Sequence, residues 1–437
     1  MSFVRNVISM MFNRLAGAVL AIFISALSAR ILTPAELGSI VAAVASVALL
    51  MRLVSLGLGQ SAQFYGALES KDNIVYSQAL LAATVPATAI SFAVLLLLGP
   101  QAGNLILAGD PVGQKYFEEL QYGIPLTLIH FVASLYVLGK REMRRYFWIS
   151  VLPLVASVLV LVWGVLARKG IHTVVLAWQT QFVLSFLLGI LLFTRRDNRS
   201  AVSFVPSLVA IYRYGLKSYV VSMAAFAAGR ISLIMGAWFT LSAEVGVFAV
   251  GRTFAEALLL VYGAVGPLIL SYVGSMDDPK DCQLFIGRVC RLSFLLFSVL
   301  SVAIALLAPI GISLIFGDQY SDSYLVVWLL LPGLIFSALQ RILENYLYGR
   351  AKQASLVFVH AASIILLVGC GALLAPYFGA IGLAMACTLT FVASFIFTAA
   401  IVYQTEGLNP NELVIPRIAD FHFLMNHFRR LYEGLWK

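Results

Sequence analysis

The sequence predicts an all-α polytopic membrane protein of about twelve transmembrane helices, arranged as two parallel six-helix repeats. Hydrophobic residues make up 61% of the 437 residues and charged residues only 11%, whereas about a quarter of a soluble domain is charged. Apolar runs of about twenty residues, long enough to cross a hydrocarbon core of about 30 Å, recur along the chain. Short sequences that occur in both halves predict the repeats.

Helices are the expected form of these spans, because lipid cannot satisfy an open backbone and the alternating strands of a barrel are absent from the sequence. The first span could be mistaken for a signal peptide, but it lacks an A-x-A cleavage site and belongs to a repeat. The predicted spans are residues 11–31, 36–58, 76–99, 122–139, 147–167, 172–194, 215–240, 243–273, 286–317, 323–348, 353–376 and 379–403.

The basic residues predict the orientation of the chain. If the amino terminus is cytoplasmic, the cytoplasmic segments carry 20 lysines and arginines. The outer segments carry only Arg30, Lys115, Arg168 and Lys169. The net charge of +9 is therefore an orientation signal, and no nucleic-acid partner is expected. Both termini are expected to be cytoplasmic.

Two pairs of similar sequences define the repeat. "LTPAELG" at 32–38 resembles "LSAEVGVF" at 241–248, with an offset of 208 residues when Glu36 is aligned with Glu244. "VLGKREMRRYFWIS" at 137–150 likewise returns as "LYGRAKQASLVFV" at 347–359. The predicted units are residues 1–200 and 207–403, followed by a tail of residues 404–437.

Each unit has six spans, so the chain returns to its starting side of the membrane after the first unit. Both units therefore enter the membrane from the same side. Parallel repeats of this kind occur in transporters, whose substrate site lies between halves that rock against each other. The alternative is that the repeat only stabilises a membrane bundle.

The repeated turn predicts a tight outer corner. Pro34 and Ser242 begin the second helix of each unit, as a first-turn proline and a capping serine, and a glutamate follows in the first turn. Gly38 and Gly246 then allow close helix approach.

Several other features are expected to be structural. The four cysteines have no metal or redox spacing, and neither a metal nor a cofactor is expected. His130 and His360 are interpreted as packing residues, and "GQKYFEEL" (113–120) and "GDQYSD" (317–322) as solvated outer loops. Residues 415–437 predict an amphipathic helix that anchors the tail on the inner leaflet.

Five arginines fall inside the predicted spans. Arg14, Arg52 and Arg341 lie within about two turns of the cytoplasmic end, so they either snorkel to the surface or form a lower cationic ring. Arg230 and Arg252 lie near mid-depth, where an arginine costs about 2.5–3.5 kcal/mol and normally faces a bundle interior or a wet cavity.

Two glutamates lie deep in the spans. Glu256 follows Arg252 by four residues, so it forms either a structural ion pair or a gating or coupling site. Glu344 is a second candidate for coupling. It shares the tenth span with Gln340, Arg341 and Asn345, a polar sector that should face the cavity.

These residues predict a cationic central compartment. Arginine grips phosphate through its planar fork, so the expected cargo is anionic and carries a phosphate or pyrophosphate group. The candidate binding residues are Arg14, Arg52, Arg230, Arg252, Arg341, Gln340 and Asn345.

Two long stretches carry a family resemblance. "ARILTPAELGSIVAAVASVALLMRLVSLGLGQSAQFY" (29–65) resembles the opening of polysaccharide-export flippases of the Wzx type. These belong to the superfamily that also holds MATE multidrug exporters and lipid II flippases. "GRAKQASLVFVHAASIILLVGCGALLAPYFGAIGLAMACTLTFVASFIFTAAIVY" (349–403) is similar to the same family.

The resemblance implies a V of two six-helix lobes around a cationic cavity, in a bacterial cytoplasmic (inner) membrane. It implies a non-enzymatic flippase that carries an undecaprenyl-pyrophosphate-linked oligosaccharide to the outer leaflet for exopolysaccharide, capsule or O-antigen assembly. The implied partners are this lipid-linked oligosaccharide and membrane lipids, and other polysaccharide-assembly proteins are further candidates. The family often has an acidic residue before the arginine of the seventh helix, whereas Gly229 precedes Arg230 here.

Two alternatives remain at this point. A MATE-type drug or metabolite antiporter would need buried acids for cationic drugs, and no aspartate lies within a span. A membrane glycosyltransferase or polymerase would need a catalytic loop outside the membrane, and the loops of this chain are short.

Overall fold

The computed structural model of the protein describes residues 2–72, 76–107, 110–194, 204–273, 278–350, 352–409 and 411–415. All regular elements in these residues are helical. In chain order they are α1 (Ser2–Ile31), α2 (Pro34–Val54), α3 (Leu58–Asp72), α4 (Ser77–Ile106), α5 (Pro111–Leu120), α6 (Gly123–Gly139), α7 (Met143–Leu166), α8 (Ile171–Thr194), α9 (Phe204–Phe239), α10 (Ser242–Ala255), α11 (Leu258–Val273), α12 (Pro279–Phe316), the 3-10 helix η1 (Asp318–Tyr320), α13 (Ser323–Gly349), the 3-10 helix η2 (Gln353–Ser355), α14 (Leu356–Glu406) and α15 (Asn411–Val414).

The helices confirm a multi-pass membrane fold. Ten helices in the described residues are long and apolar enough to cross a membrane, and α5 with α6, bent by 53°, makes eleven. The 51-residue α14 holds the last two predicted spans, and Gly379 breaks it between them with a φ of 54° and a ψ of −128°. The prediction of about twelve spans therefore agrees with the structure.

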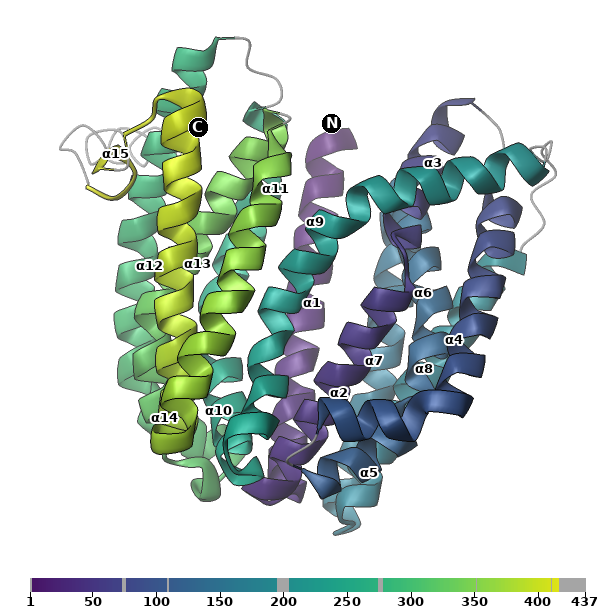
Figure 1. Cartoon of the computed structure of the whole chain (residues 1–437), viewed down its shortest axis with the longest axis vertical. Helices are drawn as coiled ribbons and strands as arrows, with labels where there is room; N and C mark the ends of the chain where they lie inside the picture. The colour runs from purple at the N-terminus through teal and green to yellow at the C-terminus, as the bar shows by residue number, and fades with distance from the viewer. Residues whose placement is uncertain are drawn as a thin grey trace, which may run out of the picture.

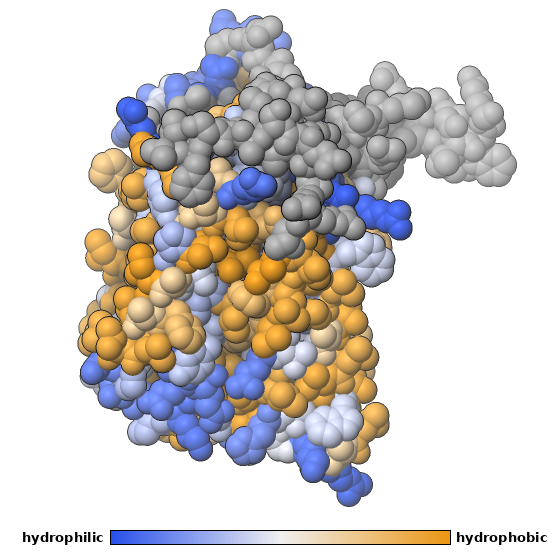
Figure 2. Space-filling view, turned by 90° about the vertical axis from the view of Figure 1, so that its right-hand side faces the viewer, coloured by the Kyte–Doolittle hydropathy of each residue, from blue (hydrophilic) through white to orange (hydrophobic). Residues whose placement is uncertain are grey.

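The surface has the apolar band that a bilayer requires. Figure 2 shows apolar side chains around the middle of the molecule and polar side chains towards its two ends on the face in view. Leu97, Leu306 and Ile310 are between 73% and 74% exposed, which is unfavourable in water but favourable against acyl chains.

The helices form two groups that spread apart towards one end (Figure 1). Helices α3–α8 lie on one side and α10–α14 on the other, with α1, α2 and α9 between them. The groups are separated at the end of the bundle where α1 begins and α14 ends, which we call the terminal side. At the opposite side they come together.

The repeated sequence forms the contact at the opposite side. A Cβ atom on Gly38 of α2 would lie 1.8 Å from the carbonyl oxygen of Ser242, and one on Gly246 of α10 would lie 2.0 Å from that of Pro34. Each glycine therefore meets the helix start of the other copy. The close approach predicted for these glycines is confirmed, and it joins the two groups of helices.

The two copies of this turn begin their helices differently. Thr33 is the N-cap of α2 and forms a capping box with Glu36. In α10 the N-cap is Leu241, which gives no side-chain cap, so the capping role predicted for Ser242 is wrong. The Glu244 carboxylate instead accepts a hydrogen bond from the backbone N–H of Ala380 at 2.8 Å. It thereby satisfies a backbone donor at the start of the helix that resumes after Gly379.

Helix α9 connects the two groups. Its first part packs on α3 and α4, and its last part packs on α10 and α14. The chain turns sharply between α2 and α3, where Leu56 and Gly57 have positive φ values of 43° and 79°. A Cβ atom on Gly57 would lie 2.1 Å from the carbonyl oxygen of Gly215, so this turn fits against the backbone of α9.

Two predicted loops are packed elements instead. The segment 113–120 lies in α5, where Tyr116, Phe117 and Leu120 are buried. In the segment 317–322, Tyr320 is fully buried. Both were expected to be solvated, and the correction arises because neighbouring helices cover their aromatic side chains. Residues 416–437 of the predicted amphipathic tail lie outside the described residues.

Candidate functional site

A cavity of about 650 Å³ lies between the two groups of helices. Residues of α1, α2, α9, α10 and α13 line it, and we call it the central cavity. Leu37, next to the α2–α10 crossing, lines one end, and Tyr348, near the end of α13, lines it towards the terminal side. Its polar and charged lining residues are Ser25, Arg52, Ser222, Arg230, Arg252, Thr253, Glu256, Arg341 and Tyr348.

The central cavity is cationic. Four arginines and one glutamate line it, which gives a formal charge of +3. A charge at membrane depth is costly unless it faces protein or water, so this lining provides a hydrated compartment that attracts anions.

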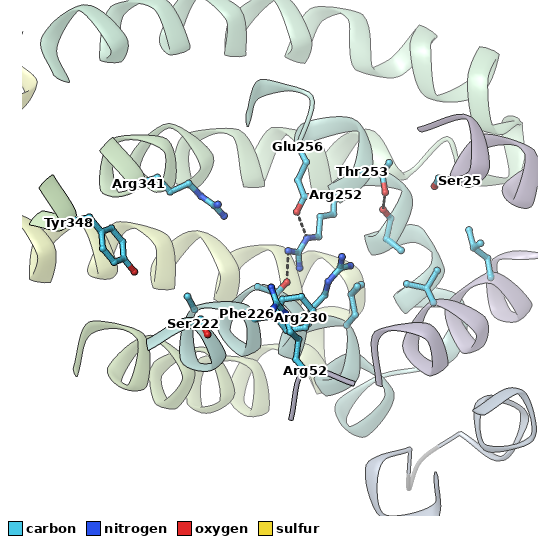
Figure 3. Close-up of a pocket in the computed structure, with 16 residues that line it drawn as sticks. Ser25, Arg52, Ser222, Phe226, Arg230, Arg252, Thr253, Glu256, Arg341 and Tyr348 are labelled. Atoms are coloured by element: carbon cyan, nitrogen blue, oxygen red, sulfur yellow. Dashed lines mark hydrogen bonds and ion pairs between the residues drawn. The ribbon is translucent and has the colours of Figure 1, made fainter. Parts of the chain in front are cut away.

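Arg52 of α2, Arg230 of α9 and Arg341 of α13 are the cations of this compartment without a carboxylate partner among the described residues, and Arg52 and Arg230 lie close to each other. The guanidinium carbon of Arg52 lies 4.2 Å from the ring centre of Phe131 and 5.0 Å from that of Phe226, and that of Arg230 lies 5.9 Å from the Phe226 ring. Figure 3 shows Arg52, Phe226 and Arg230 side by side. Within the described part of the chain neither guanidinium has a carboxylate partner, so both are available to a ligand.

Arg252 is held by the protein itself. Its Nε donates to Glu256 Oε1 at 2.7 Å, its Nη2 donates to the carbonyl oxygen of Gly229 at 2.8 Å, and its Nη1 donates to the Ser232 hydroxyl (Figure 3 draws the first two). This geometry favours a structural ion pair between Glu256 and Arg252 over a gating or coupling role for Glu256. Arg252 therefore adds charge to the cavity but has fewer donors to offer.

The polar sector of the tenth span divides between two spaces. Arg341 points into the central cavity from α13, as Figure 3 shows. Gln340 and Glu344, together with Arg341, also line a pocket of about 90 Å³ between α9, α13 and α14, which we call the side pocket. Gln340 Nε2 donates to Glu344 Oε1 at 2.9 Å, and His360 Nε2 lies 3.5 Å from the same oxygen.

This contact corrects the interpretation of His360 as a packing residue, because its imidazole has a carboxylate neighbour. Ser363 and Ser394 line the same pocket, and their hydroxyls lie 2.5 Å apart. The side pocket is thus a polar site within the second group of helices.

Two predicted binding residues lie outside both spaces. Arg14 is exposed on α1 and is not among the residues that line the central cavity or the side pocket. The Asn345 amide nitrogen donates to the Tyr262 hydroxyl at 2.5 Å and to the carbonyl oxygen of Arg341 at 2.8 Å. Asn345 therefore braces α13 against α11, and its role in binding stays a prediction.

A set of hydrogen bonds closes the opposite side of the molecule. Arg30 of α1 donates to the carbonyl oxygens of Leu314 and Ile315 at the end of α12. In return, Gln319 donates to the carbonyl oxygen of Leu32 at 2.9 Å, and Tyr320 donates to the same oxygen at 3.0 Å. The carbonyl oxygens at the end of α1 and at the end of α12 are thus each satisfied by side chains from the other segment.

Sequence reasoning missed Phe226, whose ring centre lies 5.0 Å from the guanidinium carbon of Arg52 and 5.9 Å from that of Arg230. It precedes Arg230 by four residues and so shares its helix face, a spacing that could have identified it. It missed Tyr348 as well, which follows Glu344 by the same spacing.

Comparison with models of protein families shows which family the chain belongs to. Residues 27–325 match the family model described as "Polysaccharide biosynthesis protein". The chain belongs to this family. Residues 264–427 also match the model of the lipid II flippase MurJ. No curated protein matches the sequence.

Solved structures share the fold of this polysaccharide biosynthesis family member. An inward-facing MATE multidrug transporter of the MOP superfamily has a TM-score of 0.75 at 13% identity, covering 91% of this chain and 98% of its own. The lipid II flippase MurJ in an inward closed conformation has a TM-score of 0.70 at 12% identity, with coverages of 94% and 89%. A MOP superfamily transporter from Pyrococcus furiosus has a TM-score of 0.61 at 14% identity, with coverages of 93% and 95%.

These findings confirm the predicted resemblance to Wzx-type polysaccharide flippases of the MOP superfamily. Flippase and transporter families are not enzymes, which agrees with the prediction that this protein is not an enzyme. Flippases of this kind act on lipid-linked saccharides within the membrane.

Proposed function

We propose that the protein carries an undecaprenyl-pyrophosphate-linked oligosaccharide repeat unit from the inner to the outer leaflet, for exopolysaccharide, capsule or O-antigen assembly. The observation that carries the proposal is the pair of free guanidiniums, Arg52 and Arg230, facing one central cavity of formal charge +3. The diphosphate carries the negative charge of such a cargo, and this charge needs nearby cations when it lies within the membrane.

The pyrophosphate would dock between Arg52 and Arg230, because planar guanidiniums bind phosphate oxygens in pairs. Arg341, nearer the terminal side, would meet the diphosphate as it enters. The sugars would contact polar residues of the lining such as Ser222 and Thr253. Arg14, exposed on α1, would serve the approach from the leaflet.

Transport would use alternating access between residues 1–200 and 207–403 as two lobes. We place the terminal side in the cytoplasm of a bacterial inner membrane, with both termini cytoplasmic, because the basic residues gather there. The described conformation then has its lobes joined on the outer side. Outward opening would separate the α2–α10 crossing and break the bonds of Arg30, Gln319 and Tyr320.

The cavity argues against the alternative of a drug antiporter. A cationic drug needs a free buried acid, and Glu256, the only carboxylate in the lining of the central cavity, is paired with Arg252 at 2.7 Å. Drug sensitivity of a deletion strain that still makes its polysaccharide would favour the antiporter.

Deletion of the gene provides the direct test of the proposed cargo. We expect the strain to lose its surface polymer and to accumulate one lipid-linked saccharide, because assembly of the cargo continues while its transfer stops. Mass spectrometry of extracted lipids identifies the saccharide, and a membrane-impermeant lectin reports its leaflet. A saccharide that still reaches the outer leaflet at the normal rate would contradict the proposal.

Glu344 is our candidate for coupling transport to an ion gradient. The Glu344→Gln variant should keep the hydrogen bond with Gln340 but lose the exchangeable charge beside His360. We therefore expect bound cargo to be retained and gradient-driven translocation in proteoliposomes to fall at least tenfold. The Glu344→Asp variant, which keeps the charge, should retain part of the rate. Equal rates for Glu344→Gln and the parent protein would exclude this role.

A further inference from the structure

A second large hollow lies on the outside of the first group of helices. It has a volume of about 790 Å³ and lies between the start of α7 and the end of α8. We call it the α7–α8 groove, and its lining residues are Arg144, Arg145, Trp148, Ile149, Leu188, Leu191 and Leu192. None of these residues lines the central cavity or the side pocket. The groove is therefore separate from the proposed transport site.

One end of the groove is basic. Glu142 is shared by two cations: its carboxylate lies 2.5 Å from Arg145 and 3.7 Å from Lys140. Arg144 is exposed and has no carboxylate partner among the described residues. Among the described residues, the groove is lined at this end by two arginines and Glu142 offsets the charge of one of them, so an anion is the complementary ligand at this end.

The rest of the groove is apolar and open. Trp148 is 50% exposed and Leu191 is 62% exposed, and both line it. On the same helices, Leu152 and Leu187 are also exposed. The groove thus continues into the apolar outer surface and needs an occupant with acyl chains.

The groove also lies at the right depth for a lipid. Met143 begins α7 and Thr194 ends α8 on the terminal side, so the arginines stand at the boundary where the apolar span begins. Basic residues and tryptophan are favoured at this interface, and basic pockets between transmembrane helices bind anionic headgroups.

We propose that the α7–α8 groove binds an anionic phospholipid. Its phosphate is held by Arg144 and Arg145, and its acyl chains lie along Trp148, Leu188 and Leu191. A free phosphate would leave the apolar part uncovered, and a second copy of the chain would bury the unpaired Arg144 without a partner.

Native mass spectrometry of the full chain in detergent tests the proposal. The protein is titrated with phosphatidylglycerol, which is anionic, and with phosphatidylcholine, which is zwitterionic. We expect tighter binding of phosphatidylglycerol, and a loss of about fivefold in its affinity for each arginine removed by Arg144→Ala and Arg145→Ala. Trp148→Ala should weaken binding of both lipids by removing contact with acyl chains.

Lys280→Ala, which removes an exposed cation from α12, is the matched control and should keep the phosphatidylglycerol affinity. Thermal unfolding without added lipid checks that the variants are folded, and phosphatidylglycerol should raise the unfolding temperature of the parent protein more than that of Arg144→Ala. Equal affinities for the two lipids, or an Arg144→Ala protein that binds like the parent, would overturn the proposal. Displacement of phosphatidylglycerol by a polyprenyl diphosphate would instead assign the groove to the cargo and overturn it as well.

Discussion

Replacing Arg230 by alanine should abolish surface polysaccharide while leaving the amount of protein in the membrane unchanged. The guanidinium has no carboxylate partner in the described part of the chain, so its removal leaves no buried acid uncompensated. Losing one charged contact to a bound phosphate costs about 2–5 kcal/mol, or about 30-fold or more in affinity. Arg52→Ala should have a similar effect, because both guanidiniums lie against the Phe226 ring and line the same cavity.

Arg213→Ala is the matched control for this experiment. Arg213 is exposed on the same helix as Arg230, α9, but does not line the central cavity. Polymer staining, protein blotting and binding of a polyprenyl diphosphate to purified protein give the three readouts. If Arg230→Ala and Arg52→Ala bind the diphosphate as tightly as Arg213→Ala does, the assigned docking position is wrong.

A side chain at the α2–α10 crossing should have an effect of comparable size. In Gly38→Leu the Cβ atom alone would lie 1.8 Å from a backbone oxygen of Ser242, and a backbone cannot move aside as a flexible side chain can. Overpacking of this kind costs about 1–3 kcal/mol. The conformation with joined helices should lose stability, and transport should fall because its cycle requires this contact.

The experiment compares the unfolding temperature in detergent and the labelling of cysteines introduced at the opposite side. Gly17→Leu, on α1, is the control, since no atom lies within 4 Å of a Cβ built there. Gly38→Leu should unfold at a lower temperature and be labelled faster than Gly17→Leu. Identical behaviour of the two variants would show that the crossing does not hold the two groups together.

Much of the fold follows from local properties of the sequence. The apolar runs predict the spans because each run must bury its own backbone in lipid, whatever its neighbours are. The repeat predicted that Gly38 and Gly246 allow close helix approach, but it did not show that the helix each one approaches is the matching helix of the other unit. The orientation of Arg230 towards an internal cavity followed in the same way from the cost of a charge in lipid.

The remaining features depend on partners that are distant in the sequence. The sequence places Arg252 at a depth similar to that of Arg230 and predicts at most its pairing with Glu256, but Ser232 and the backbone of Gly229 also engage its guanidinium. The segment 317–322 looked like a solvated loop because its polar residues are recognisable locally. The hydrogen bonds from Gln319 and Tyr320 to Leu32 span 287 and 288 residues, so no local pattern in the sequence reveals them.

The contact of α2 with α10 has a consequence for the origin of the chain. Gly38 meets Ser242 and Gly246 meets Pro34, so the interface is isologous, the type that two identical subunits form about a two-fold axis. Two separate copies of a six-helix ancestor would pair through the same surface. Once the copies were fused, each could change independently, as the different helix starts at Thr33 and Leu241 record.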